Sequence, residues 1–421
     1  MRTLRDDPER VRQGALKKRF PDRAKAVDRV LELDAQLRGL IPELDGLRAA
    51  QKQAGKAMGK LSPTERDAVL VEQRELKGRI QGLETREGEL QAAIREQLLL
   101  VPNVPDQEVP DGIDDTGNVE VRRVGAVPSF SFSQKSHDEI AVARGWLDVE
   151  RAATMAGSRN YLLFAELALL HDAVLRLALE HMVKKGFVPV DPPLLVRDEV
   201  MIGTGFFPGG EEQTYRVAED GLNLIVIAEA PVTAIHADQI LDESDLPKRY
   251  VARSACFRRE AGTYGKDTKG LYRVHQFQKV EQVVIDVADE ARSRRHHEDI
   301  VRNSEEVLAA LELPYRVVAV CGGDLGVPQA FKYDIECWMP SRQNWGETHS
   351  ASRFYDYQAR RLKMRYRETT SRKVAHCHTL NNTVIASPRI LIPLLEVHQR
   401  ADGRVHVPQA LRPYLGGRET I

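Results

Sequence analysis

Apolar residues recur with a seven-residue period through much of the first hundred positions, from about Ala24 to Leu99. They alternate in steps of three and four residues, and a break at Gly59–Pro63 divides the repeat into two runs. Two helices with such a seam, joined by a short turn, predict an antiparallel coiled-coil arm that projects roughly 50 Å. The seam positions are Val30, Leu33, Leu37, Leu40, Leu44 and Leu47, then Leu76, Ile80, Leu83, Leu90 and Ile94, with Glu87 filling one position of the second run.

Three residues inside the first run disfavour a helix: Gly39, Pro42 and Gly46. Proline in a helix interior costs about 3 kcal/mol and glycine about 1 kcal/mol relative to alanine. We therefore expect the first helix of the arm to be kinked or frayed at this point.

Basic residues recur every four positions near the tip of the arm, and no acidic residue lies among them in the sequence. A four-residue spacing places them on one face of a helix. The pattern allows two interpretations, a solvated helix face or a surface that binds nucleic-acid phosphates. This basic stripe consists of Arg48, Lys52, Lys56 and Lys60.

After the arm, a stretch rich in proline and acidic residues, Val101–Gly112, predicts a linker. We expect a helical domain at residues 1–105, with the arm at about 24–99, and a larger domain at residues 106–421. In the larger domain a long helix is expected at Ala156–Gly186. It precedes FVPVDPPLLV, a proline-containing strand that suits a sheet edge or an interface. Further strands are expected at Leu222–Ile227, Lys279–Asp286, Tyr315–Val320 and Lys332–Trp338, and a last helix at Pro388–His398.

These elements do not alternate as regular βαβ units, and neither GxGxxG nor GxxxxGK[ST] occurs. The usual parallel nucleotide-binding folds are therefore disfavoured. The pattern indicates an α+β fold, in which a mixed or antiparallel sheet is flanked by helices.

Composition narrows the class of protein. Charged residues make up 29% of the 421 positions and the formal net charge is -1, which disfavours wholesale coating of nucleic acid but allows a local basic patch. The four cysteines form no CxxC pair, so a disulfide framework or a structural zinc site is not expected. No apolar signal core begins the chain and no apolar run is long enough for a membrane span. We expect a soluble, cytoplasmic protein with no membrane contact.

The stretch from Arg258 to Glu281 crowds both signs of charge, three glycines and several aromatic rings beside an apolar strand. A strand–loop–strand of this composition can fold over a phosphate chain, because a guanidinium such as that of Arg258 offers two donors to phosphate oxygens. Glycines at 262, 265 and 270 allow close backbone approach, and Phe277 suits stacking on a base. An ordinary charged hairpin is the alternative.

The same stretch, FRREAGTYGKDTKGLYRVHQFQKVE, closely resembles the second signature motif of class II aminoacyl-tRNA synthetases in its seryl-tRNA synthetase form. GFVPVDPPLLV resembles the first, dimer-forming motif, and TLNNTVIASPRILIPLLE resembles the third, with its arginine at Arg389. GETHSASRFYDYQARR and VPQALRPYLGG match further family segments in the expected order. The resemblance covers essentially the whole chain.

The resemblance implies an antiparallel helical arm followed by a class II catalytic domain on a mostly antiparallel sheet. It also implies the reaction: the carboxylate of L-serine attacks the α-phosphorus of ATP, and the seryl group then passes to the 3′ end of tRNA(Ser). Such a reaction depends on positioning and on charge neutralisation more than on covalent work by the protein. A homodimer and a tRNA-binding role for the basic stripe are implied as well.

The resemblance also implies residue roles at the ATP end of the site. Arg258 matches the arginine that holds the α-phosphate, and Arg389 the one that clamps the far end of a bent ATP. Glu260 is placed to accept from the adenine amino group and Phe277 to stack on the ring. Glu347 and Ser350 match the residues that hold Mg²⁺ between phosphates. Arg259, Val274, Thr348 and His349 complete the ATP-contacting segments.

At the serine end, the resemblance assigns the pocket to Glu229, Glu281 and Thr383, with Asn381 nearby. The serine-binding set also includes Ile227, Ala228 and Arg258. A carboxylate there can pair with the substrate ammonium. Asp334 and Glu336, which share a strand face by alternation, could form a second metal pair or support neighbouring arginines. We favour the supporting role.

The chain departs from its family at five positions. Ile227 stands, before Ala228, where threonine usually contacts the substrate amino group, and Arg259 replaces a usual serine. Gly346, Ala351 and Arg353 replace a usual arginine, cysteine and asparagine. These changes are expected to gather at the amino-acid pocket and its rim.

Three hypotheses follow: a seryl-tRNA synthetase, a diverged paralogue that activates serine or an analogue and serves another acceptor, and a non-catalytic binding protein. The first is favoured, because the residues implied for ATP handling are intact.

Overall fold

The computed structural model describes residues 1–58, 62–262 and 270–421, and for residues 63–65 the backbone alone. Lys60 of the basic stripe and Gly265 therefore lie outside the described residues. The chain forms two compact units, Met1–Val104 and Pro105–Ile421. No helix within the described ranges is both long and apolar enough to cross a membrane.

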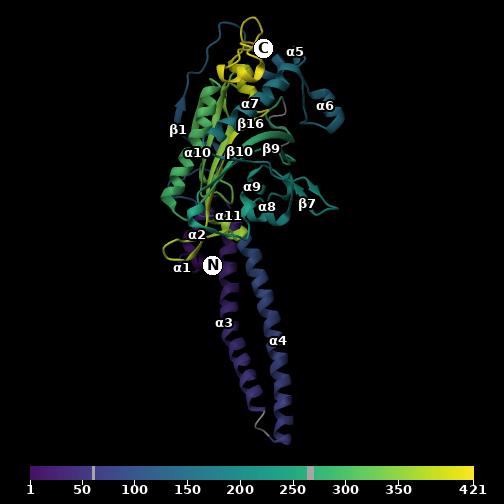
Figure 1. Ribbon diagram of the computed structural model, residues 1–421, viewed down its shortest axis with the longest axis vertical. Coiled ribbons are helices and arrows are strands. Elements are labelled where there is room, and N and C mark those ends of the chain that lie inside the picture. Colours follow the sequence, from purple (N-terminus) through teal and green to yellow (C-terminus); the bar gives the residue numbers. More distant parts are fainter. Residues whose placement is uncertain (59–61, 263–269) are drawn as a thin grey trace. The chain divides into compact units, whose positions relative to one another are not determined.

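The first unit is a helical arm (Figure 1). Its helices are α1 (Arg2–Asp6), α2 (Pro8–Lys17), α3 (Pro21–Ala57) and α4 (Pro63–Leu100). The long helices α3 and α4 pack side by side, as Figure 1 shows, and every predicted seam position is buried or half-buried. The predicted antiparallel coiled coil is confirmed.

Helix α3 runs without interruption through Pro42, so the fraying expected there is wrong. Leu44, two residues further on, is 1% exposed. Burial of a leucine side chain stabilises by about 1.5–3 kcal/mol, which is comparable to the helix penalty of one proline, about 3 kcal/mol.

The second unit is built on an eight-stranded sheet in the order β1-β11-β12-β13-β16-β10-β9-β4. Neighbouring strands are antiparallel except for the pair β4 and β9. The strands are β1 (Val119–Val124), β11 (Tyr315–Ala319), β12 (Phe331–Met339), β13 (Asn344–Tyr355), β16 (His378–Ser387), β10 (Gln276–Asp286), β9 (Lys248–Phe257) and β4 (Val188–Val190). The predicted fold class is confirmed, and the proline-containing strand β4 lies at a sheet edge as expected.

Two long helices, α7 (Ala165–Lys184) and α10 (Glu290–Ala310), cover one face of this sheet (Figure 1). Val280 and Val284 of β10 face them in the main apolar core. Because strand side chains alternate, Lys279 and Glu281 point to the opposite face. Buried charges on that face need partners, and this is where the candidate site lies.

The remaining elements surround the sheet. Helices α5 (His137–Ala143), α6 (Val149–Ala156), α8 (Asp198–Thr204), α9 (Glu229–Thr233), α11 (Tyr357–Leu362) and α12 (Leu391–Val397) flank it. The small sheets are β2 (Leu147–Asp148) with β3 (Leu162–Leu163), β5 (Leu195–Arg197) with β7 (Leu222–Leu224) and β6 (Arg216–Val217), and β15 (Val374–His376) with β14 (Arg365–Arg367) and β8 (Ile240–Asp242).

Several predicted elements are shorter than expected, and the last helix, for example, spans Leu391–Val397 instead of Pro388–His398. The helix predicted from Ala156 begins only at Ala165, because Gly157 ends α6 with a positive φ of 86° and the chain then forms β3. The strand predicted at Leu222–Ile227 ends at Leu224, since Ile225 to Ala228 turn into α9.

Candidate active site

A cavity of about 300 Å³ lies on the sheet face opposite α7 and α10. Strands β10, β13 and β16, together with the segment before β10 and the segment after β16, supply most of its wall. It brings together most of the residues singled out from the sequence. These are Ile227, Glu229, Arg258, Glu260, Val274, Phe277, Glu281, Glu347, Thr348, His349, Ser350, Asn381, Thr383 and Arg389.

Arg258 is held by its backbone, and its guanidinium faces the cavity. Its N–H donates to the carbonyl of His275 at 2.9 Å, and its carbonyl accepts from His275 Nδ1 at 3.0 Å. The guanidinium lies 5.1 Å from the ring centroid of Phe277. Its Nε is buried and has no hydrogen-bond partner in the described part of the chain. A buried unsatisfied donor at a cavity wall is suited to an anionic ligand.

Arg389 closes another side of the cavity. Its guanidinium lies 4.4 Å from the ring centroid of Tyr272, and its Nε donates to the Tyr272 carbonyl at 3.1 Å. Its Nη1 donates to the carbonyl of Glu347 at 3.0 Å. Nearby, Arg273 Nη1 donates to Glu260 Oε2 at 2.6 Å. Arg389 and the ion pair of Arg273 with Glu260 therefore hold in place the segment that precedes β10.

Strand β13 places a row of polar groups along the cavity. Thr348 and His349 are buried, and His349 Nε2–H donates to the carbonyl of Val384 at 3.0 Å. Burial lowers the pKa of His349 to about 4, so the ring is neutral and its Nδ1, 2.8 Å from Thr348 Oγ1, acts as the acceptor. Thr348 and His349 therefore form part of the cavity wall.

Strands β12 and β13 also carry side chains whose oxygen atoms could bind a metal ion. Asp334 pairs with Ser350 in the strand register and its carboxylate lies 3.0 Å from Lys332 Nζ. Burial raises the pKa of Asp334, with Lys332 opposing. Burial would also raise the pKa of Glu347, but the charges of Arg389 and Lys332 outweigh it and hold that pKa below its usual value.

Two buried carboxylates lie at the other end of the cavity. Glu229 accepts a hydrogen bond from Gln358 Nε2 at 2.6 Å and another from Asn381 Nδ2. Glu281 pairs with Lys279, whose Nζ lies 2.5 Å from Glu281 Oε2 and donates to Thr383 Oγ1 at 3.1 Å. Burial and the neighbouring Glu281 raise the pKa of Glu229 to about 8. Burial also raises the pKa of Glu281, against the opposing effect of Lys279.

Comparison with known proteins decides the family. A model of the seryl-tRNA synthetase N-terminal domain matches residues 1–105, and a model of the class II tRNA synthetase core domain (G, H, P, S and T) matches residues 215–398. The serine–tRNA ligase of Deinococcus radiodurans is 43% identical over 421 residues, covering 100% of this chain and 98% of the relative. The chain belongs to the seryl-tRNA synthetase family.

Solved structures agree with this assignment. The crystal structure of seryl-tRNA synthetase from Pyrococcus horikoshii complexed with ATP has a TM-score of 0.95 at 40% identity and covers 100% of this chain and 98% of its own. The cytoplasmic serine–tRNA ligase of Naegleria fowleri in complex with AMP has a TM-score of 0.88 at 31% identity, covering 99% and 95%. The chain is a class II serine–tRNA ligase, and full-length agreement does not favour the hypotheses of a paralogue or a non-catalytic protein.

Two residues that the resemblance assigned to this synthetase site do not line its cavity. The side chain of Arg259 is exposed, and its backbone N–H donates to the carbonyl of Gln213 at 2.9 Å. Ala228 is fully buried in an apolar cluster beside β10. Of the basic stripe, Arg48 donates to Glu84 of the facing helix at 2.9 Å, whereas Lys52 and Lys56 are exposed.

The departures from the synthetase family do not gather within the cavity itself. Among the five, only Ile227 belongs to the cavity-lining residues. A side chain at Gly346 would place its Cβ 2.7 Å from the side chain of Met339. Ala351 is buried, and its carbonyl accepts from His297 Nε2 at 3.0 Å.

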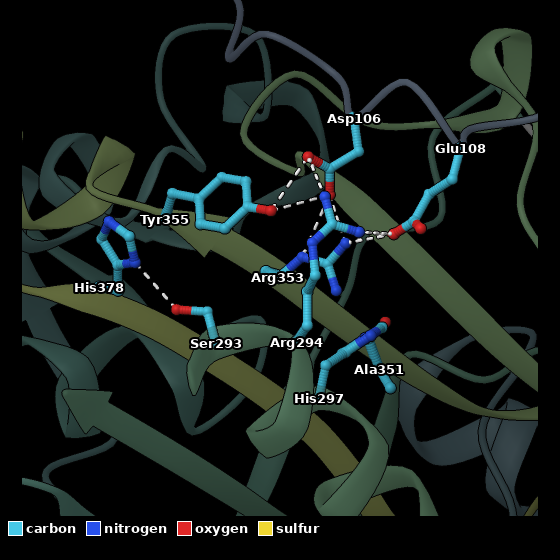
Figure 2. Close-up of polar contacts among 9 residues, drawn as sticks. All are labelled: Asp106, Glu108, Ser293, Arg294, His297, Ala351, Arg353, Tyr355 and His378. Atoms are coloured by element: carbon cyan, nitrogen blue, oxygen red, sulfur yellow. Dashed lines mark hydrogen bonds and ion pairs between the residues drawn. The ribbon is translucent and has the colours of Figure 1, made fainter. Parts of the chain in front are cut away.

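Arg353 has a structural role outside the cavity, shown in Figure 2. It donates to the carboxylates of Asp106 and Glu108, the latter at 2.7 Å. Tyr355 donates to Asp106 at 3.0 Å and Arg294 to Glu108 at 2.5 Å. These contacts fasten the predicted linker to β13 and α10.

The predicted supporting role of the acidic residues on β12 holds for one of them. Glu336 accepts from Arg316 at 2.6 Å, whereas Asp334 pairs with a lysine, Lys332.

Sequence reasoning missed several residues that shape the synthetase site. Lys279 lies two positions before Glu281, so strand alternation could have placed it on the same face. Gln358 and Tyr272 gave no comparable signal, because they reach the site from a helix end and from a loop.

Proposed function

We propose that this synthetase activates L-serine within the described cavity, through the residues that the family resemblance assigned, and delivers it to tRNA(Ser). A serine carboxylate oxygen attacks the α-phosphorus of ATP, the bond to the bridging oxygen breaks, and pyrophosphate leaves. A terminal ribose hydroxyl of the tRNA then attacks the seryl carbonyl, and AMP leaves. The observation that carries the proposal is one cavity with unsatisfied cationic donors at one end and paired carboxylates at the other.

At the ATP end, the buried Nε of Arg258 and its neighbouring guanidinium nitrogens are suited to the α-phosphate. Because negative charge grows there in the transition state, a fixed donor lowers the barrier more than it strengthens ground-state binding. Phe277 offers a ring for the adenine, and Arg389 binds the distal phosphates.

At the serine end, charge decides which group fits. Glu281 is ion-paired with Lys279, whereas Glu229 accepts only from neutral amides among the described residues, so a substrate ammonium would supply further positive charge. Its arrival favours ionisation of Glu229, whose pKa is about 8 in the ligand-free site. Thr383 and Asn381 offer neutral hydrogen-bonding groups for the substrate hydroxyl.

The oxygen donors on β13 fit Mg²⁺. Glu347 and Ser350 line the cavity, and Asp334 beside them keeps a buried Oδ1 that has no partner among the described residues. Within the same ranges, no group of three or more His, Cys, Asp or Glu residues gathers around a metal position. Mg²⁺ commonly binds through one or two carboxylates plus substrate phosphates, and it would neutralise phosphate charge here.

The arm is assigned to tRNA. Lys52 and Lys56 are exposed and form no ion pair in the described part of the chain, so they are available for phosphates. Arg48 would have to exchange Glu84 for a phosphate. We also assign a homodimer interface to the segment Gly186–Val196, where Val188 in β4 is 55% exposed and Leu195 in β5 is 42% exposed, each in an edge strand of its sheet. Light scattering that reports a monomer at micromolar concentration would remove the dimer.

Serine-dependent ATP–pyrophosphate exchange tests the pocket assignment. Glu281→Gln keeps the shape of the side chain and removes its charge, so the KM for serine should rise by at least ten-fold while ATP binding is retained. Glu336→Gln is the matched control, because Glu336 lies on a neighbouring strand and pairs with Arg316 outside the cavity. Equal behaviour of the two variants would contradict the assignment.

A further inference from the structure

A fully buried carboxylate outside the cavity gathers three segments of the catalytic unit. Glu396, in α12, is 0% exposed. Its Oε1 accepts from the His137 backbone N–H at 3.0 Å and from Ser341 Oγ at 2.8 Å, and its Oε2 accepts from the Ser341 N–H at 2.8 Å. His137 Nδ1 lies 2.8 Å from the same carboxylate. Burial would raise the pKa of Glu396, but these hydrogen bonds hold it below its usual value.

The hydrogen-bond network sets the tautomer of His137. A carboxylate accepts only, so Nδ1 carries the proton and donates to Glu396. Nε2 is then the acceptor, and it receives the backbone N–H of Leu271 at 3.2 Å. A doubly protonated ring would direct a donor at that N–H, so the contact requires the neutral form. Ser136, which caps α5 together with Glu139, fixes where His137 enters the helix.

Leu271 begins the segment that returns from the loop into the cavity wall. The preceding Gly270 has φ 68°, and a Cβ there would lie 2.1 Å from His137 Nε2, so only glycine allows this approach. Leu271 and the following Tyr272 both line the cavity. The imidazole therefore contacts the backbone at the point where the segment reaches the site.

Tyr272 links this backbone contact to the ATP end of the cavity. The guanidiniums of Arg389 and Arg342 each lie 4.4 Å from its ring centroid. Arg389 directly precedes the segment that forms α12, which contains Glu396, and Arg342 directly follows Ser341. The Glu396 carboxylate therefore holds the segments next to Arg389 and Arg342. Through His137 it also holds the backbone next to Tyr272, whose ring both guanidiniums contact.

We propose that His137 and Glu396 are positioning residues for ATP: they hold the Leu271–Tyr272 backbone and thereby set the orientation of Arg389. The role of Arg389 toward ATP rests on the proposed function. Neither residue lines the cavity, so they act through Leu271, Tyr272 and Ser341 and without contact to substrate.

Two substitutions at His137 separate positioning from packing. His137→Leu removes the donor and the acceptor, whereas His137→Gln retains one of each at similar separation. Loss of a buried hydrogen bond predicts an approximately ten-fold rise in the ATP dissociation constant and in the KM for ATP for His137→Leu. His137→Gln should stay within about three-fold of wild type, and the KM for serine should change little in both.

His398→Ala is the matched control, because this imidazole lies directly after α12 but donates to the carbonyl of Leu311, at 2.9 Å, away from the cavity. It should lower the melting temperature without changing ATP affinity. Glu396→Gln provides a second route to the same ATP defect if His137→Leu does not fold.

Calorimetric titration with ATP reads the effect without requiring turnover. The proposal is overturned if ATP affinity is unchanged in the variants, or if the KM values for ATP and serine rise equally. The proposed function would stand in either case, because it is tested separately, by serine-dependent exchange and tRNA charging with the wild-type protein and by the Glu281→Gln variant.

Discussion

Ile227 is the one departure from the family that lines the cavity, and its replacement by threonine gives the sharpest prediction. The side chain is 8% exposed, at the serine end. The family's usual threonine places a hydroxyl beside the substrate ammonium, whereas isoleucine offers none. The substitution Ile227→Thr should therefore add one hydrogen bond to a charged group.

The substitution should strengthen serine binding and weaken protein stability, and the size of each effect can be estimated. A hydrogen bond to a charged group stabilises by about 1.5–3 kcal/mol, which corresponds to a roughly ten- to hundred-fold fall in the KM for serine. Loss of buried apolar volume from the cluster around Ile227 should lower the unfolding free energy by about 1 kcal/mol. The variant is thus expected to bind serine more tightly while being slightly less stable.

Val226→Thr is the matched control, because Val226 is also 8% exposed and lies in the same apolar cluster but does not line the cavity. Pyrophosphate exchange over a range of serine concentrations and thermal melting should be measured for both variants. Both should melt earlier, and only Ile227→Thr should need less serine. An unchanged or higher KM for serine in Ile227→Thr would refute the reasoning.

Three further predictions concern other parts of the site. Arg258→Ala should lower the exchange rate by about 10²–10³ and Arg258→Lys should recover only part of it, since an ammonium cannot grip two oxygens; a fully active lysine variant would contradict this. Replacing all four residues of the basic stripe by alanine should weaken tRNA charging and flatten its salt dependence while exchange is unchanged, and equal loss in both assays would indicate misfolding. Because the pKa of Glu229 is raised from 4.5 to about 8, the folded state retains a proton that the unfolded chain releases. Its contribution to stability should fall between about pH 4.5 and 8, and Glu229→Gln should remove that slope from pH-dependent melting curves.

The arm and the sheet edges could be predicted from the sequence because they depend on short-range patterns. The seven-residue repeat is a property of neighbouring turns, and all its positions turn inward. The proline of β4, Pro189, identifies an edge because proline cannot donate to a second strand. The fraying expected at Pro42 was wrong, because the helix penalty of proline is local whereas the burial of Leu44 comes from packing between helices.

Within the site, sequence motifs identified residues but not their partners. Arg258 and Glu281 could be found by resemblance, whereas the contact of Arg353 with Asp106 joins positions separated by 247 residues. Likewise, His137 and Glu396 carry no motif of their own, and only the fold brings them to Leu271. Contacts between distant segments depend on tertiary packing, which periodicity does not encode.

Serine-dependent ATP–pyrophosphate exchange by the purified protein, followed by transfer of labelled serine to tRNA(Ser), tests the central claim most directly. The account predicts exchange that requires serine and ATP without tRNA, and formation of seryl-tRNA once tRNA(Ser) is added. Exchange that persists with serine omitted, or labelled serine that never reaches tRNA(Ser), would contradict it.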